Sequence, residues 1–290
     1  MINVFRMELY RVFRSMSTWI LLLVYFCLYL FAGGMIGMLT GNSEIVTNFQ
    51  SELTSVSGTQ AMQGGVSVYV DESQMDTMQS MFGEITDYAE MFNMCMMGNM
   101  VVLITAIFIG IHGTGHVVTG FQKNLSGSTK KWHFVVSNLL ILLLFNIVLL
   151  VLGALALRIV MFVTHTGVTL NDVSRLLVYS GVYLLLATAY GMFGGVIADF
   201  TRSRVAAIAV PVVYCTAASS LVYMLLNYIA KLGLGIADFE SERYLPYGAL
   251  CNLMLCDPME YYVKAAVSSV VFILLCICVS VIVKRKQDVK

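Results

Sequence analysis

Long stretches without a charged residue dominate the chain. Six of them lack Asp, Glu, Lys and Arg altogether, and they cover residues 15–43, 91–122, 132–157, 176–198, 205–230 and 265–283. A helix of about 20 residues crosses the roughly 30 Å of bilayer hydrocarbon, so each stretch is long enough for one crossing. The pattern predicts six membrane-spanning helices near residues 18–39, 95–116, 134–157, 176–198, 205–228 and 264–283. The first run is too long for the apolar core of a signal peptide, so we expect it to stay in the mature protein.

The flanks of these spans predict their orientation, because Lys and Arg resist translocation much more than acidic residues do. Basic residues gather at the N-terminus, between spans two and three, between spans four and five, and in the C-terminal tail; they are Arg6, Arg11, Arg14, Lys123, Lys130, Lys131, Arg202, Arg204, Lys284, Arg285, Lys286 and Lys290. Residues 44–90, in contrast, hold eight acidic residues and no Lys or Arg. We therefore expect both termini to be cytoplasmic.

Residues 1–16 are expected to form an amphipathic helix along the inner membrane surface. Val4, Leu9, Val12 and Phe13 lie close to one helical stripe, with Arg6, Arg11 and Arg14 at its rim. The arginines would face anionic lipid head groups. A simple positive-inside flank without another task is the alternative interpretation.

Two further segments are expected on the outer side. In residues 41–90, Met75, Met78 and Phe82 begin a 3,4 spacing that predicts an amphipathic helix, either as an outer gate or resting on the outer leaflet. Residues 229–263 include an uncharged run, 244–256, that is too short to cross, so we expect a re-entrant hairpin there. Pro211 predicts a kink inside span five, because proline lacks the amide hydrogen.

Composition supports a membrane protein and excludes several other classes. Hydrophobic residues make up 59% of the chain and charged residues 12%, about half the charged share of soluble domains. The net charge is zero, so nothing predicts a nucleic-acid partner. The seven cysteines show no CxxC pair, which leaves no metal module or disulfide framework to infer, and whether Cys251 and Cys256 are bridged stays open.

Motifs for catalysis are absent from the sequence, but two candidate metal sites are present. No window matches GxxxxGK[ST], so ATP hydrolysis would need another polypeptide. His112 and His116 lie four residues apart on one helix face and could bind a metal ion through their imidazoles. The simpler interpretation is that both imidazoles lie at the membrane interface and meet water or head groups. The cluster from Met91 to Met100, which includes Cys95, suggests Cu(I), although methionine is equally a packing residue.

One inner loop carries a family resemblance. The segment TGFQKNLSGSTKK from Thr119 to Lys131, followed by Ser137-Asn138 in span three, resembles the inner loop of ABC-2 type transporter permeases. Gly120, Lys123, Asn124, Gly127 and Asn138 fit that pattern. The acidic residue usual before the first glycine is missing, and lysines replace the usual arginines. The layout of an interfacial helix, six spans and a broken outer hairpin is similar as well.

The resemblance implies a single all-α transmembrane domain over residues 1–290 of a bacterial plasma-membrane protein. It implies a non-catalytic permease that pairs with a second copy or a relative and docks on cytoplasmic ABC ATPases. Those ATPases would bind ATP and Mg, and this chain would bind no cofactor. The segment 117–133 would be the coupling segment, with Gly120, Lys123, Asn124, Gly127, Lys130 and Lys131 in ATPase docking. The cargo would be a hydrophobic or amphipathic peptide, bacteriocin or drug. A copper-handling membrane protein using His112, His116 and the Met91–Met100 cluster is the alternative.

Overall fold

The protein is helical wherever its structure is described. The computed structural model describes residues 2–41, 88–96, 100–113, 132–164, 173–233, 240–255 and 257–287, and these residues include no strand. Four helices are long and apolar enough to cross a membrane, and there are up to six spans if each of two bent helix pairs counts as one. The predicted all-α class with several candidate spans is therefore confirmed.

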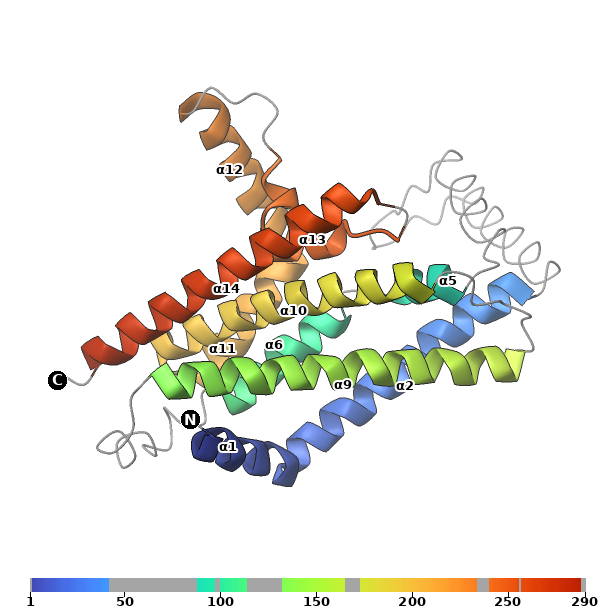
Figure 1. Cartoon of the computed structure of the whole chain (residues 1–290), viewed down its shortest axis with the longest axis horizontal. Helices are drawn as coiled ribbons and strands as arrows, with labels where there is room; N and C mark the ends of the chain where they lie inside the picture. The colour runs from blue at the N-terminus through green and yellow to red at the C-terminus, as the bar shows by residue number, and fades with distance from the viewer. Residues whose placement is uncertain are drawn as a thin grey trace, which may run out of the picture. The chain divides into compact units, whose positions relative to one another are not determined.

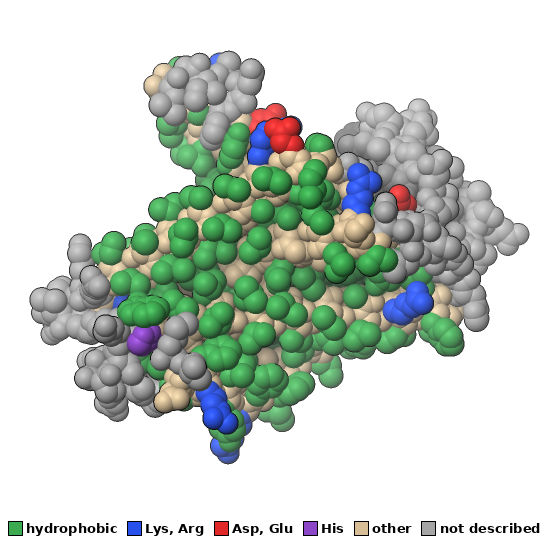
Figure 2. Space-filling view, in the orientation of Figure 1, with side chains coloured by type: hydrophobic (Ala, Val, Ile, Leu, Met, Phe, Trp, Pro, Cys, Tyr) green, Lys and Arg blue, Asp and Glu red, His purple; other side chains and the backbone are tan. Residues whose placement is uncertain are grey.

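The four long helices each contain a span predicted from the sequence. They are α2 (Met16–Gly41), α9 (Trp132–Thr164), α10 (Val173–Thr201) and α14 (Met259–Gln287). Hydrophobic side chains cover much of the face shown in Figure 2. On α14 alone, Val263, Val267, Val271 and Leu274 are more than half exposed. Apolar surface of this extent is compatible with lipid as the surrounding solvent.

The second predicted span is a bent pair of helices. α5 (Tyr88–Met96) and α6 (Met100–His112) meet at an angle of 50°. The apolar pattern predicted one span over 95–116, and the described helices instead begin seven residues earlier. The residues of the break lie outside the described part of the chain.

The fifth predicted span is bent more strongly. α11 (Arg204–Val213) continues through a π-helical turn, η1 (Tyr214–Ala218), into α12 (Ser219–Gly233), and the two parts differ in direction by 71°. The predicted kink is confirmed, although the direction changes at the π-helical turn that follows Pro211. α12 then leads away from its neighbours (Figure 1).

Two tyrosines stabilise this bend. Proline removes an amide donor and a π-turn changes the hydrogen-bond register, so backbone carbonyls near the bend benefit from other donors. The Tyr190 hydroxyl of α10 donates to the Pro211 carbonyl at 2.5 Å, and the Tyr247 hydroxyl of α13 (Pro246–Cys251) donates to the Cys215 carbonyl at 2.5 Å. The bend is therefore supported from two neighbouring helices.

The chain divides into two compact units. Unit 1 comprises Met1–Tyr25, Met96–Leu152 and Ser174–Lys290, and unit 2 comprises Phe26–Cys95 and Gly153–Val173. Inside unit 2, the Tyr88 hydroxyl donates to the Ala154 carbonyl at 3.0 Å, which joins α5 to α9. The single domain expected over residues 1–290 stays a prediction.

A polar triad lies in the core of unit 1. The Thr105 hydroxyl of α6 donates to Asn146 Oδ1 of α9 at 2.9 Å, and Asn146 Nδ2 donates to Thr188 Oγ1 of α10 at 3.3 Å. All three side chains are almost fully buried. Hydrogen bonds of this kind link helices in apolar surroundings, where the hydrophobic effect between helices is weak.

A glycine lets these three helices approach closely. A Cβ atom at Gly191 of α10 would lie 2.7 Å from Leu142 Cδ2 and 2.9 Å from Thr105 Cγ2. Real Cβ contacts are not this short, so any other residue here would force the Leu142 and Thr105 side chains to shift. The triad and the glycine together define how α6, α9 and α10 pack.

Candidate functional site

Five ionisable side chains gather at one end of unit 1. Glu8 and Arg11 belong to α1 (Ile2–Arg14), and His112, Asp199 and Lys284 lie near the carboxyl ends of α6, α10 and α14. All five line one small cavity of about 40 Å³. We call these five residues the polar cluster.

The polar cluster lies where the ends of several helices meet. α6, α10 and α14 end beside it, whereas α2 and α9 begin beside it, as Thr18 and Asn138 demonstrate. Figure 1 shows the same arrangement, with α1 next to these ends. The described helices that reach the polar cluster therefore do so alternately with their amino and carboxyl ends up to α10, while the predicted cytoplasmic placement of the basic flanks stays a prediction.

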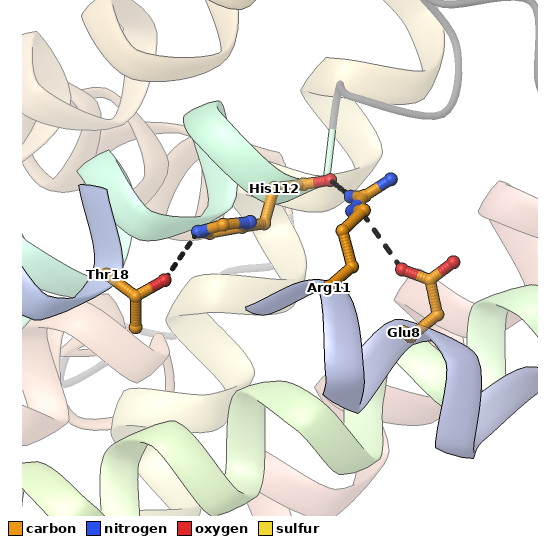
Figure 3. A network of polar contacts seen from close by, with 4 residues as sticks. All are labelled: Glu8, Arg11, Thr18 and His112. Carbon is orange, nitrogen blue, oxygen red and sulfur yellow. Dashed lines mark hydrogen bonds and ion pairs between the residues drawn. The ribbon is translucent and has the colours of Figure 1, made fainter. Parts of the chain in front are cut away.

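Arg11 attaches α1 to the end of α6. Its Nη2 donates to the His112 carbonyl at 2.7 Å and lies 3.7 Å from Glu8 Oε2 (Figure 3). The last carbonyls of a helix lack intrahelical donors and carry the negative end of the helix dipole, so a guanidinium is well suited to this position. Only 3% of the Glu8 side chain is exposed, and it offers the arginine a nearby negative charge.

His112 attaches the same helix end to α2. Its Nε2 lies 2.9 Å from Thr18 Oγ1, and its ring centroid lies 4.8 Å from that of Phe108. Figure 3 shows the ring turned toward Thr18 while the backbone carbonyl faces Arg11. One residue at the end of α6 therefore contacts both α1 and the beginning of α2.

Asp199 and Lys284 form a buried ion pair between α10 and α14. Lys284 Nζ lies 3.3 Å from Asp199 Oδ1, and each side chain is only 7% exposed. Burying two charges is costly unless they are paired, so this contact constrains the two helix ends to stay together. The sequence had placed Asp199 next to Arg202 and Arg204, but both arginines are exposed and the partner comes from the far end of the chain.

The arrangement suits mechanical coupling better than bond-making chemistry. Opposite charges are matched, with Glu8 and Asp199 against Arg11 and Lys284. The neighbouring cavity is close to the size of a single water molecule. A displacement of α6 at His112 would therefore be transmitted to α1 and α2 through direct contacts.

The N-terminal helix is confirmed, but one of its arginines is used differently from the expectation. Arg6 and Arg14 are exposed, and Arg14 bonds the Tyr10 hydroxyl at 3.4 Å. Arg11 was expected to face lipid head groups, and it instead turns toward Glu8 and His112. Its guanidinium finds an acceptor in the His112 carbonyl and an acidic neighbour in Glu8, so both partners come from within the protein.

Several predicted site residues lie outside the described part of the chain. They are the docking residues Gly120, Lys123, Asn124, Gly127, Lys130 and Lys131, the outer-gate residues Met75, Met78 and Phe82, and also His116, Met97 and Cys256. Their predicted roles stay predictions.

The described members of the two candidate metal sites are mostly buried. Met91, Cys95 and Met96 are less than a tenth exposed, and the His112 ring has Thr18 as its neighbour rather than water or head groups. Among the described residues, no three His, Cys, Asp or Glu side chains are grouped so as to hold a metal ion.

Sequence reasoning missed the contacts of five residues in or beside the polar cluster and the core triad. Glu8 is the single acid in a basic helix, which is a usable signal for an internal partner. No such signal marks Thr18 or Asn146, because hydroxyl and amide side chains are common inside apolar runs. None marks the Asp199–Lys284 pair either, because residues that pair across 85 positions leave no local pattern in the sequence. No protein-family model matches this chain, and no curated protein matches it.

Proposed function

We propose that the chain is the permease subunit of a bacterial ABC exporter of the ABC-2 type. Six crossings arise when each bent helix pair counts as one span, with both termini in the cytoplasm and residues 229–263 as an outer re-entrant segment. A second permease, either another copy or a relative, completes the path for a hydrophobic or amphipathic peptide, bacteriocin or drug. Separate ABC ATPases hold ATP and Mg.

The observation that carries this proposal is the contact between Arg11 and the His112 carbonyl. His112 is the last residue of α6, five positions before the segment 117–133 that resembles a coupling segment. Force applied to that segment would reach the polar cluster first. Four other helices end or begin there, so a small displacement would be shared among them.

Transport would follow from a shift between two arrangements of the two permeases. The ATPases would bind the coupling segment differently in their ATP-bound and free states, and this difference in binding free energy would bias the equilibrium. The residues of the coupling segment would make the contact, and Arg11, Thr18 and His112 would transmit it.

Two sets of variants distinguish docking of the ATPase from transmission of its movement through Arg11. In membranes that contain the chain and an ABC ATPase encoded beside it, Lys130→Glu with Lys131→Glu should abolish co-purification of the ATPase. Arg11→Met keeps the side-chain length but removes all donors, so the ATPase should still co-purify while permease-dependent stimulation of ATP hydrolysis falls.

Arg6→Met is the matched control, because Arg6 lies on the same helix and is exposed. Undiminished association of the Lys130 and Lys131 variant would contradict the docking assignment. Labelling of residues 123–131 by an impermeant reagent from outside the cell would contradict the orientation.

Copper handling remains the competing proposal. Its remaining support is the grouping of thioethers and the Cys95 thiol along residues 91–100, a ligand set that favours Cu(I). Stoichiometric copper in the purified protein, lost in a variant with both His112 and His116 replaced by Ala, would favour it over export.

A further inference from the structure

A second and much larger cavity lies at the opposite end of α14. Its volume is about 620 Å³, within the usual range for small-molecule sites. Three pieces of unit 1 form its walls: the short helix η2 (Ser241–Arg243) with its flanks, the loop after α13, and the first turns of α14. Lys264 of this cavity and Lys284 of the polar cluster are 20 residues apart on one helix, about 30 Å or one bilayer thickness.

The walls of this cavity are held in place by specific contacts. A Cβ at Gly248 of α13 would lie 2.5 Å from the Glu242 carbonyl oxygen, so α13 packs directly on the backbone of η2. The Ser241 amide donates to Asn227 Oδ1 at 2.8 Å, and the Tyr262 hydroxyl donates to the Met254 carbonyl at 2.7 Å. The cavity is therefore built before any ligand enters, which reduces the entropy cost of binding.

The lining has an excess of negative charge. Glu240 forms an ion pair with Arg243, and Glu260 forms one with Lys264 at 2.6 Å. Glu242 and Asp257 also line the cavity, and neither has an ion pair among the described residues. A group of red and blue side chains lies beside the projecting helix α12 in Figure 2. Two carboxylates thus remain without a matching cation.

The details of the lining favour an organic cation over a metal ion. Asp257 Oδ2 accepts the Met254 amide at 2.8 Å, so its carboxylate is oriented while its other oxygen can accept from a ligand. The Tyr261 hydroxyl is enclosed and has no hydrogen-bond partner among the described residues. The ligand therefore meets the Tyr261 ring and not its hydroxyl, and the ring offers a face for a cation. Arg243 and Lys264 would repel a bare divalent ion, and the volume far exceeds that of one ion.

We propose that this cavity binds an organic cation carrying two amino or guanidinium groups, one for Glu242 and one for Asp257. The Tyr261 ring lies at the wall of the cavity as a face for one of these cations. Binding at this site does not depend on the transport function proposed above. Only the assignment of this site to the outer face of the membrane rests on the proposed function.

Direct binding to the full chain in lipid nanodiscs tests the proposal. Spermidine and trilysine are the probes, measured by isothermal titration at low salt. Glu242→Gln and Asp257→Asn keep shape and hydrogen-bonding capacity but remove one charge each. Because each variant removes one charge-assisted hydrogen bond to the ligand, each should weaken binding about tenfold. Tyr261→Phe keeps the ring and should bind as the unaltered chain does.

Glu90→Gln is the control, since Glu90 is an exposed carboxylate on α5 that does not line the cavity. It should bind as the unaltered chain does, and a thermal melt of every variant checks folding. Tighter trilysine than spermidine would identify a basic peptide as the ligand, and the reverse a small polyamine. Three outcomes would overturn the proposal. They are the absence of saturable binding, equal binding of the probes by all variants, and binding of calcium but of neither amine probe, with the calcium binding lost in the variants.

Discussion

The buried pair between Asp199 and Lys284 makes the most direct test of the polar cluster. We consider Asp199→Asn and Lys284→Met, separately and together. Glu8 and Asp199 balance Arg11 and Lys284 around one cavity, so each single replacement leaves one charge in excess there. The double replacement restores the balance.

The magnitude follows from the geometry. At the observed 3.3 Å, two unit charges attract by about 5 kcal/mol at an effective dielectric constant of 20. Removing one partner of a buried pair costs about 3 to 5 kcal/mol, whereas replacing both partners by neutral groups costs far less. Each single variant should therefore be clearly less stable than the double variant.

Thermal unfolding of the purified chain in detergent measures this difference. With about 2 to 4 °C per kcal/mol for chains of comparable length, each single variant should lower the midpoint by roughly 6 to 20 °C. The double variant should recover at least half of the summed loss. The exposed pair Glu260–Lys264, whose side chains are 76% and 60% exposed, serves as the matched control and should show no resolvable shift or coupling. Additive losses in the Asp199 and Lys284 cycle would refute the reasoning, because independent effects would mean that the two charges do not stabilise each other.

Three further predictions concern the core and the loop region of unit 1. Asn146→Leu should lower stability by about 1 to 2 kcal/mol in the same thermal assay, because Thr105 and Thr188 lose their shared partner; an unchanged midpoint would contradict the triad. Gly191→Val should lower the thermal midpoint, because its Cβ alone would lie 2.7 Å from Leu142 Cδ2 and the Leu142 side chain must shift, while Gly181→Val, with open space around its Cβ, should not. Burial raises the pKa of the Cys251 thiol. In a variant that keeps Cys251 as its sole cysteine, this thiol should therefore react slowly with maleimide at neutral pH, and the reaction rate should still increase with pH above the ordinary thiol pKa of about 8.5. A rate that reaches a plateau near pH 8 would contradict the raised pKa.

Hydrophobic patterning determined the helical class and the location of the long helices. The runs free of charge predicted α2, α9, α10 and α14 within a few residues. A helix that faces lipid must be apolar on nearly every side, and this requirement can be read from the residues of that helix alone. The 3.6-residue spacing of Val4 and Val12 likewise predicted α1, and both side chains are buried. Pro211 marked the bend of the fifth span for an equally local reason.

The tertiary structure alone decided which polar groups meet. Asp199 had two arginines close by in the sequence, yet its partner is Lys284; Arg11 was expected at the head groups, yet it caps α6 at His112. The Thr105, Asn146 and Thr188 triad joins three helices whose sequences show no shared pattern. Hydropathy and periodicity report what surrounds a single helix, whereas these contacts depend on how several helices end at one place. That convergence is a property of packing, so only the folded chain reveals it.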